Sequence, residues 1–335
     1  MNSAGFTECG SSMKPTKEPL YFIVNPAANN GRAQETWTAL ASWLSFEKIP
    51  YRVAFSQDGD DIERLSRLAV AEAGAVVAGV GGDGTLSRIA DALVGTEAVL
   101  GVIPAGTGND FARSFRIPVS PSEACAVLLQ GLTVPLDVGR MNGRMFLNVV
   151  GAGLDAAVVV DANRLFKKFA GSLGYFLSLL KQLIFFQPME MEIRLDSNVF
   201  RTKAWFVTVA NARYYGSGMK VAPMADPQDG LADVIVVENL HRLRFLSLFP
   251  LVYSGRHVGH SAVKLFRSAQ ITVVSKKPLF VHADGDLYGT TPLTIVMERH
   301  AVRLKVPRDK GTGDLSHFNS WDKGTGDLSH FNGLG

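Results

Sequence analysis

Hydrophobic residues in the first third of the chain occur in short runs that alternate with longer amphipathic stretches. Four runs have the length of buried strands: 20–25, 51–55, 75–80 and 99–103. Three stretches between them have helix-like composition: 32–47, 60–73 and 85–93. Because strands alternate with helices over short connections, this part predicts a mainly parallel sheet covered by helices. Such sheets bind ligands at the carboxyl ends of their strands.

A further helix is expected at Ser120-Pro121-Ser122-Glu123. Serine is a preferred N-cap, proline suits the first helical position, and glutamate stands three residues after the cap.

After about residue 140 the pattern changes to short strand-like runs, several of which alternate in period two. These runs are 145–150, 189–195, 204–210, 232–237, 269–274, 279–283, 293–297 and 302–306. One long helical segment is expected near 164–186. This half therefore predicts an antiparallel sandwich or barrel. A cleft between two unlike domains is the expected place for an active site.

Three segments bear on targeting and on the chain ends. The polar residues 1–18 lack the apolar core of a signal peptide, which predicts a flexible leader. The apolar stretch 173–186 contains Lys181 and Gln182 and is shorter than the roughly 20 residues of a membrane span, so no transmembrane helix is expected. The sequence DKGTGDLSHFN occurs at 309–319 and again at 322–332, and its composition predicts a solvated tail.

Composition narrows the class of protein. The 34 Lys and Arg residues nearly balance 31 Asp and Glu residues, so the net charge of +3 gives no nucleic-acid-binding footprint. Cys9 and Cys125 are too few for a disulfide framework or a four-cysteine zinc site, which indicates a reducing cytoplasm.

Nine of the 33 glycines fall between residues 74 and 108, and two loops account for most of these nine. One loop, 79–85, lies between a predicted strand and a predicted helix, and the other, 104–110, follows the next strand. Glycines at strand ends let backbone N–H groups approach a phosphate closely, and a helix N-terminus favours negative charge. Each loop also carries an aspartate that can serve magnesium. The pair of loops therefore predicts a nucleotide phosphate site, although neither matches the Walker A or the dinucleotide fingerprint.

In these loops the sequence resembles the diacylglycerol kinase catalytic family, which includes bacterial soluble lipid kinases and the sphingosine and ceramide kinases. The resemblance spans about 20–307. It rests on Asn25-Pro26, 81–85, 104–113, 136–139, Asn148 with Gly151, Gly153 and Asp155, Asp229-Gly230, and Asp284-Gly285-Asp286.

The resemblance implies a two-domain, ATP- and Mg²⁺-dependent kinase of a lipid hydroxyl. The implied ATP-binding residues are Asn25, Pro26, Ala27, Ala28, Asn29, Ser56, Gly82, Asp83, Gly84, Thr85, Leu86, Ser87, Arg88 and Thr107. Ser56 stands where the family usually has threonine.

The implied catalytic groups are all carboxylates. Asp83, Asp110 and Asp137 would form a network around the catalytic magnesium, and Asp284 would be the general base. Asp286 stands where the family usually has glutamate, which puts its auxiliary role in doubt. A second, structural cation would be held by Asp226, Asp229 and Leu231, where Asp226 and Leu231 contribute backbone carbonyls.

The implied domains are a leader at 1–18, a nucleotide-binding α/β domain at 19–140 and a β-rich lipid-substrate domain at 141–297. A strand at 298–308 would return to the first domain, and 309–335 would be a disordered tail. The resemblance also implies a cytoplasmic protein that contacts the inner membrane face reversibly. The oligomeric state stays open, with a homodimer as one option.

Other interpretations accompany these. Asp284 in Asp-Gly-Asp suits a turn, and a lone histidine such as His282 is more often structural. The basic and aromatic segment 164–186 is either a membrane-facing element or a core helix with a solvated edge. Two rival functions are an NAD-kinase-like enzyme with a soluble acceptor and a non-catalytic lipid-binding relative.

Overall fold

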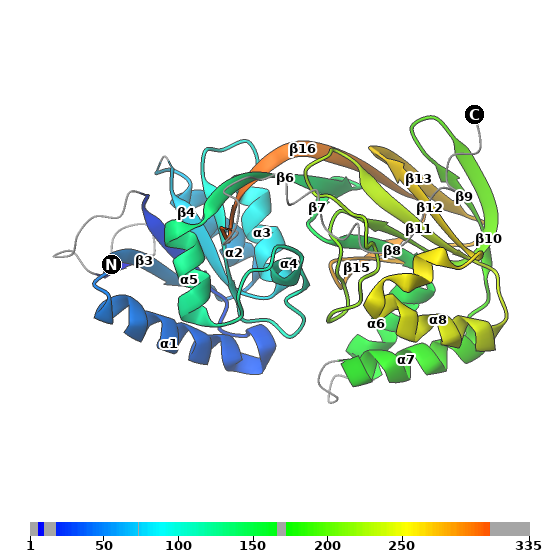
Figure 1. Ribbon diagram of the computed structural model, residues 1–335, viewed down its shortest axis with the longest axis horizontal. Helices are drawn as coiled ribbons and strands as arrows, with labels where there is room; N and C mark the ends of the chain where they lie inside the picture. The colour runs from blue at the N-terminus through cyan, green and yellow to red at the C-terminus, as the bar shows by residue number, and fades with distance from the viewer. Residues whose placement is uncertain (1–5, 10–17, 73, 166–171, 309–335) are drawn as a thin grey trace.

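The computed structural model describes residues 6–9, 18–72, 74–165 and 172–308 of the chain. Figure 1 shows two parts joined side by side, with a strand-rich arch running between them.

The first part is a sheet with strand order β1-β3-β2-β4-β5. Its strands are β1 (Thr7–Cys9), β2 (Leu20–Val24), β3 (Tyr51–Phe55), β4 (Val76–Gly81) and β5 (Val99–Pro104). The neighbours among β2 to β5 pair in parallel, and β1 pairs antiparallel with β3. Every residue of β2, β4 and β5 is buried, as expected for central strands covered on both faces.

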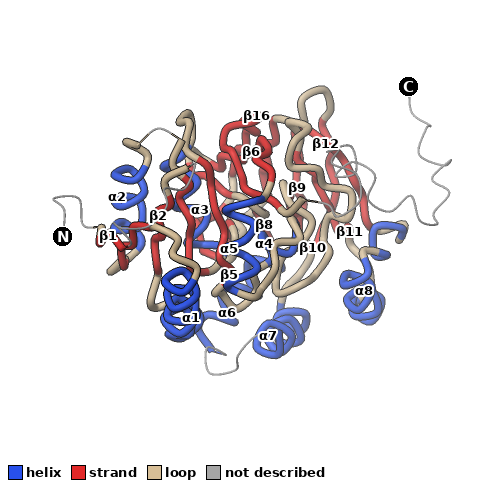
Figure 2. The backbone as a smooth tube through the Cα atoms, turned by 60° about the vertical axis from the view of Figure 1, so that its left-hand side comes forward, coloured by secondary structure: helices blue, strands red, loops and turns tan. Residues whose placement is uncertain are grey.

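Helices cover this sheet on both sides (Figure 2). They are α1 (Arg32–Phe46), α2 (Gly59–Ala69), α3 (Asp83–Leu93) and α5 (Pro121–Gln130), with the short η1 (Ala28–Gly31) and α4 (Asp110–Ser114) at strand ends. The helix α1 packs against α5, and α2 packs against α3. Since the chain reverses direction across the sheet after β3, right-handed crossovers put these two pairs on opposite faces.

The second part is an antiparallel β-sandwich. Its strands are β7 (Arg144–Phe146), β8 (Val149–Gly153), β9 (Met189–Arg194), β10 (Val199–Ala210), β11 (Ala232–Glu238), β12 (Val263–Ser268), β13 (Gln270–Ser275), β14 (Phe280–Ala283) and β15 (Asp286–Thr290). Three helices and a short turn accompany them: α6 (Leu154–Leu165), α7 (Ser172–Phe185), α8 (Arg242–Ser254) and η2 (Arg256–Gly259). One apolar cluster fills the sandwich, and another lies between its strands and these helices.

Two long strands connect the parts: β6 (Leu132–Met141) and β16 (Leu293–Val306). They pair antiparallel with each other, with an irregularity between Glu298 and Val302. The start of β16 also pairs with β13, and its end pairs in parallel with β5. The strand β16 therefore belongs to both sheets.

The predicted fold class is confirmed, because a parallel α/β part precedes an antiparallel β-sandwich. Several details differ from the sequence expectations. The run at 145–150 divides between β7 and β8, whereas the runs at 293–297 and 302–306 form the single strand β16. The strands β1, β6, β12 and β15 and the helices α4 and α8 had no counterpart among the predicted elements. Residues 1–18 were expected to form a flexible leader, but β1 lies within them, pairs with β3 and follows the buried Phe6.

Helix boundaries also shift. The segment expected as one helix near 164–186 contains the end of α6 and all of α7, and residues 166–171 lie outside the described part. The helix expected from 85 begins at Asp83, which puts that aspartate in the first helical turn. Ser120 is the N-cap of α5 as expected, but its side chain makes no capping hydrogen bond.

No helix of the described residues is both long and apolar enough to cross a membrane.

Candidate active site

Two glycine loops meet at the carboxyl edge of the parallel sheet. Gly82 follows β4 as the N-cap of α3, and Gly106 follows β5. The backbones approach so closely that a side chain on Gly106 would collide with the Cα atom of Gly82. The contact requires glycine and leaves the backbone N–H groups at the start of α3 accessible to an anion.

The loop after β2 joins the same edge. The Asn25 side-chain amide donates to the Thr85 hydroxyl at 3.0 Å, and the Thr107 hydroxyl donates to the Asn29 side-chain oxygen at 3.3 Å. The structure therefore brings together predicted ATP-binding residues that follow β2, β4 and β5, three neighbouring parallel strands of the sheet.

Ser56 and Arg88 each form a hydrogen bond to a neighbouring element. The buried Ser56 hydroxyl donates to the Val24 carbonyl at 3.3 Å, so the side chain is engaged in linking β2 to the end of β3. The Arg88 guanidinium donates to the Glu63 carboxylate on α2 at 3.1 Å.

Asp83 and Asp110 form a coupled pair of carboxylates between the loops. Asp83 accepts hydrogen bonds from the backbone amides of Asp110, at 3.3 Å, and Phe111, at 3.0 Å. Burial raises the pKa of Asp83. Burial, and then the charge of Asp83, raise the pKa of Asp110.

Asp110 also connects the two parts of the molecule. Its carboxylate accepts hydrogen bonds from the amides of Ser217, at 2.7 Å, and Gly218, at 2.8 Å, and it pairs with Arg113. The two carboxylate side chains supply hard oxygen donors and repel each other, so the pair fits a divalent cation such as Mg²⁺.

Asp137 lies in a different environment. Its carboxylate accepts hydrogen bonds from the amides of Gly230 and His300, both at 2.6 Å. Neither Asp83 nor Asp110 is among its contacts in the described part of the chain. The structure thus brings together two of the three carboxylates expected around magnesium. It places Asp137 on β6, where its carboxylate binds the loop before β11 through Gly230.

That loop contains the residues expected for a structural cation. The Asp226 carboxylate accepts from the Gln228 amide at 3.2 Å, and the Asp229 carboxylate accepts from the Leu231 amide at 2.9 Å. Asp229 also pairs with the Arg267 guanidinium. Among the described residues, no cluster of three or more His, Cys, Asp or Glu side chains could hold a metal. The second cation site therefore stays a prediction, and Arg267 already neutralises one of its carboxylates.

Asp284 directly follows β14, and its carboxylate accepts four hydrogen bonds. Its carboxylate accepts hydrogen bonds from the amides of Leu147, at 2.8 Å, Asn148 and Val149, both at 2.9 Å, and from the Ser87 hydroxyl at 2.7 Å. These amides lie on the link between β7 and β8, and Ser87 reaches across from α3. The backbone of Asp284 is left-handed, with φ of 48°.

The protonation state of Asp284 follows from two opposing effects. Burial raises the pKa of the Asp284 carboxyl, while the hydrogen bonds from Leu147 and Ser87 lower it. A carboxylate whose pKa lies above the ordinary value near 3.9 is the better proton acceptor.

A small pocket surrounds Asp284 between the two parts. Gly84, Ser87 and Arg88 of α3 line one side, and Arg144, Asp286 and Tyr288 of the sandwich line the other. The predicted base therefore faces the predicted phosphate loop.

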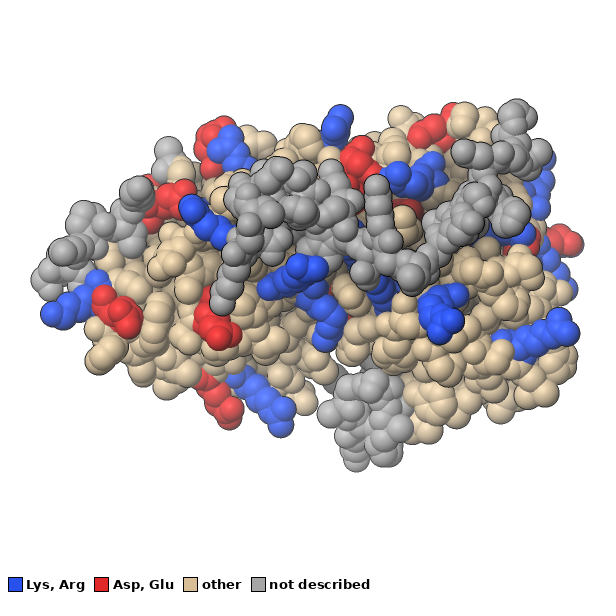
Figure 3. Space-filling view, viewed as in Figure 1, with Lys and Arg blue, Asp and Glu red and all other residues tan. Residues whose placement is uncertain are grey.

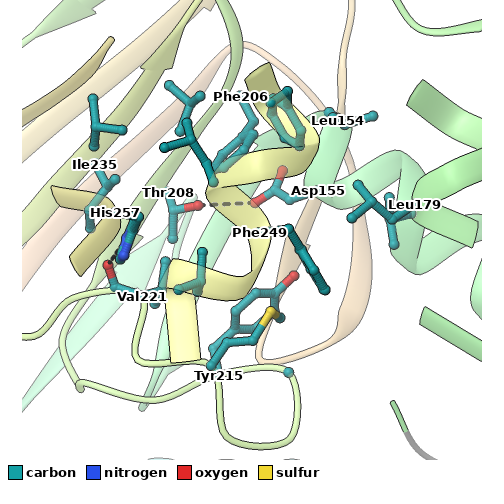
Figure 4. A pocket seen from close by; sticks show the side chains of 18 of the residues that line it. Leu154, Asp155, Leu179, Phe206, Thr208, Tyr215, Val221, Ile235, Phe249 and His257 are labelled. Atoms are coloured by element: carbon teal, nitrogen blue, oxygen red, sulfur yellow. Dashed lines mark hydrogen bonds between the residues drawn. The ribbon is translucent and has the colours of Figure 1, made fainter. Parts of the chain in front are cut away.

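A larger, apolar pocket lies within the second part (Figure 4). It encloses about 950 Å³, some of it open to solvent. The helices α6, α7 and α8 and the strands β10 and β11 contribute most of its lining. Leu179, Phe206, Ile235 and Phe249 are among the apolar side chains labelled around it.

One end of the apolar pocket is polar. The Asp155 carboxylate accepts a hydrogen bond from the Thr208 hydroxyl at 3.1 Å and lies 3.4 Å from His282. His282 is fully buried, and its ring stacks on Tyr215. Among the described residues neither of its ring nitrogens has a hydrogen-bond partner. A side chain on Gly151 would collide with both Asp155 and His282, so glycine in β8 allows this approach. His282 stands two residues before Asp284, which places this polar end near the predicted base.

Sequence reasoning missed several parts of this site. It gave no sign of the Ser217 and Gly218 amides, of the amides that hold Asp284, or of Arg144 in its pocket. Backbone donors have no residue signature, and an isolated arginine in a short strand carries none either.

Known proteins share the domains and the fold of this chain. Residues 19–141 match the diacylglycerol kinase catalytic domain, and 148–306 match the YegS C-terminal NAD kinase beta sandwich-like domain. Two crystal structures from Bacillus anthracis strain Sterne share the fold. One, of a diacylglycerol kinase, has a TM-score of 0.67 and 21% identity over 87% of this chain and 98% of its own. The other has a TM-score of 0.73 and 24% identity over 88% and 97%.

Two curated relatives match most of the chain at higher sequence identity than these crystal structures. A diacylglycerol kinase of Mycobacterium tuberculosis is 31% identical over 293 residues, which are 85% of this chain and 94% of the relative. A diacylglycerol kinase of Bacillus subtilis is 27% identical over 271 residues, which are 79% and 89% of the two chains. At this identity and coverage, with both domain models in the expected order, the chain belongs to the diacylglycerol kinase family of lipid kinases.

Proposed function

We propose that this protein transfers the γ-phosphoryl group of ATP to a hydroxyl group of a membrane lipid, with Asp284 as the general base. The observation that carries the proposal is the position of Asp284. It shares one pocket with the start of α3, where a phosphate would lie, and it stands two residues from the polar end of the apolar pocket.

The transfer begins at the acceptor. The Asp284 carboxylate takes the proton of the lipid hydroxyl, and the hydroxyl oxygen forms a bond to the γ-phosphorus. The bond from that phosphorus to the bridging oxygen breaks, and ADP leaves with its electron pair. The amides of Leu147, Asn148 and Val149 and the Ser87 hydroxyl keep the base oriented throughout.

Asp83 and Asp110 would hold the magnesium ion. The chemistry that Mg²⁺ supplies in phosphoryl transfer is neutralisation of phosphate charge. The chain's own contribution is to position the two carboxylates through backbone amides from both parts of the molecule.

The apolar pocket supports a lipid acceptor over a soluble one. Acyl chains would pack among α6, α7 and α8, and a lipid hydroxyl or another donor of the head group would bond to Asp155. An NAD-kinase-like acceptor would instead need polar partners along most of its length, whereas most of the side chains that line this pocket are apolar.

The pocket lining includes residues of α7 and α8, whose outer surfaces carry exposed apolar side chains. Phe185 of α7 is 72% exposed and Leu243 of α8 is 70% exposed. Arg242 and Arg244 flank Leu243, and α8 contains no acidic residue. On the face drawn in Figure 3, blue but not red side chains occupy the lower right region, where Figure 1 shows α8. This surface suits reversible contact with an anionic bilayer on the cytoplasmic face. Lys167 and Lys168, two basic residues of the segment 164–186 for which a membrane-facing role was one interpretation, lie outside the described residues.

The test of the activity is a panel of acceptors with radiolabelled ATP and Mg²⁺. Diacylglycerol, phosphatidylglycerol, a long-chain base and NAD would each be offered, with a control lacking acceptor. We expect a phosphorylated lipid and no phosphorylated NAD. Incorporation into NAD alone would overturn the proposal.

Replacing the base tests its role. Asp284→Asn keeps the shape but removes the proton acceptor, so turnover should fall on the order of 10²–10⁴-fold while ATP binding persists. Calorimetric titration with a non-hydrolysable ATP analogue checks the binding. Wild-type turnover in this variant would exclude Asp284 as the base.

A further inference from the structure

Arg144 occupies a fixed position beside Asp284. It is the first residue of β7, after a turn in which Asn142 and Gly143 have φ of 48° and 86°. The Asn142 side-chain oxygen accepts a hydrogen bond from the Thr294 amide of β16 at 2.9 Å, which anchors that turn. Immediately after β7 come the amides that hold the Asp284 carboxylate. The backbone therefore fixes both groups through one short segment.

The guanidinium of Arg144 is oriented but has no charged partner. Its central carbon lies 3.8 Å from the centre of the Tyr288 ring, which restricts the side chain by stacking. Within the described part of the chain, no carboxylate forms an ion pair with it. Neighbouring arginines differ, since Arg88 bonds to Glu63 at 3.1 Å and Arg140 bonds to Glu298 at 2.7 Å.

Most of the carboxylates around Arg144 already have hydrogen-bond partners. Glu63 is bound by Arg88, Asp91 by Arg140, and Asp284 by three amides and a hydroxyl. Asp286 lines the same pocket without an ion pair or hydrogen bond among the described residues. Burial, and then the charge of Arg88, lower the pKa of Arg144. The charges of Asp286, Glu63 and Asp91 oppose this and raise it. Within the described residues the guanidinium N–H groups of Arg144 have no hydrogen-bond partner, so they can bind an anionic group that enters the pocket.

We propose that Arg144 is a further catalytic residue, which donates hydrogen bonds to the γ-phosphoryl oxygens as the group passes from ATP to the lipid hydroxyl. This inference rests on the proposed kinase function. Arg144 gains and loses no proton, and its planar guanidinium matches two phosphoryl oxygens at once. In the transition state, negative charge is spread over these oxygens of the transferring group. A guanidinium beside them therefore stabilises the transition state more than it stabilises bound ATP.

The test compares Arg144→Gln with Arg201→Gln in the wild-type background. Arg201 lies on β10 and pairs with Glu192, so its replacement removes one positive charge away from the site. With the lipid acceptor and Mg-ATP, we expect kcat of Arg144→Gln to fall on the order of 10²-fold or more, with a nearly unchanged KM for ATP. Arg201→Gln should retain wild-type kinetics.

A second variant guards against a merely structural effect. Arg144→Lys keeps the charge and the aliphatic stem, but an ammonium group cannot contact two oxygens in one plane, so kcat should stay roughly tenfold or more below wild type. Tyr288→Leu removes the stacking contact and keeps Arg144. If kcat falls by a similar factor in Tyr288→Leu while Arg144→Lys keeps the wild-type kcat, Arg144 has a packing role instead.

The outcomes separate the two hypotheses. An active wild type with unchanged kcat in Arg144→Gln or Arg144→Lys would overturn the assignment of Arg144 alone. A wild type that phosphorylates no lipid in the panel would overturn the proposed function, and the role of Arg144 with it.

Discussion

Among the described residues, Ser87 is the one side chain whose hydrogen bond joins Asp284 to the nucleotide-binding part. Its hydroxyl donates to the Asp284 carboxylate at 2.7 Å from the first turns of α3, where phosphates would lie. The other three donors are amides of the sandwich, and they hold the base whether or not α3 is in place. A single hydroxyl therefore couples the base to the loop that would bind ATP.

The Ser87 hydrogen bond should be visible in the pH dependence of activity. A general base must be ionised, so kcat/KM is present above the pKa of Asp284 and is lost as the pH falls through it. Burial raises that pKa and the Ser87 bond lowers it. Ser87→Ala should therefore move the acid limb of kcat/KM to higher pH, because the variant loses a hydrogen bond that stabilises the charged carboxylate.

Thr38→Ala is the control for this profile, since the Thr38 hydroxyl bonds only to the Gln34 carbonyl within α1. Equal acid limbs in the Ser87→Ala and Thr38→Ala proteins would show that Ser87 does not tune the base.

At the scale of elements, α7 and α8 form an apolar surface beside the acceptor pocket. Figure 1 shows both helices below the sandwich strands, and residues of both line the pocket. On their outer sides Ile184 and Phe185 of α7 and Leu243 of α8 lie open to solvent. Exposed apolar side chains next to an apolar pocket suit a bilayer that delivers the lipid.

Vesicle sedimentation tests this surface. A double variant, Phe185→Ser with Leu243→Ser, should bind anionic phosphatidylglycerol-containing vesicles at least about 30-fold more weakly, since each of the two side chains would contribute roughly 1–3 kcal/mol of apolar burial. Val119→Ser is matched to it, because Val119 is 67% exposed on the nucleotide-binding part. Equal loss in both proteins, or no loss in either, would contradict the assignment.

The elements also show where sequence patterns succeed. Tyr51–Phe55 was predicted to the residue, because a short apolar run with polar flanks fits a buried strand. The helix α8 was missed because Pro250 lies inside it and its apolar residues form no clear stripe. The polar end of the apolar pocket was equally hidden: Asp155 appeared only as a motif residue, and its approach to His282 depends on tertiary contacts through Gly151.

At the scale of the molecule, β16 connects the two parts because it belongs to both sheets. Ile295 near its start is fully buried in the sandwich core, and Leu304 near its end is fully buried in the core of the parallel sheet. The sequence pattern read these as two separate strands, since Arg299 and His300 interrupt the apolar alternation. The backbone instead continues through that interruption, and the His300 amide donates to Asp137 at 2.6 Å.

Damage at one end of β16 should therefore weaken both parts. Leu304→Ala leaves a cavity in the first core and should cost about 2–5 kcal/mol of the free energy of unfolding. Because β16 also pairs with β13, hydrogen exchange should accelerate in the sandwich strand β13 as well as in β5. Leu40→Ala provides the comparison, since Leu40 is fully buried on α1 in the same core but has no link to the sandwich. It should accelerate exchange chiefly in the first part. If β13 is as protected from hydrogen exchange in Leu304→Ala as in Leu40→Ala, the two parts unfold independently. In that case local contacts such as the Ser87 hydrogen bond, rather than the shared strand, hold the proposed base beside the proposed phosphate loop.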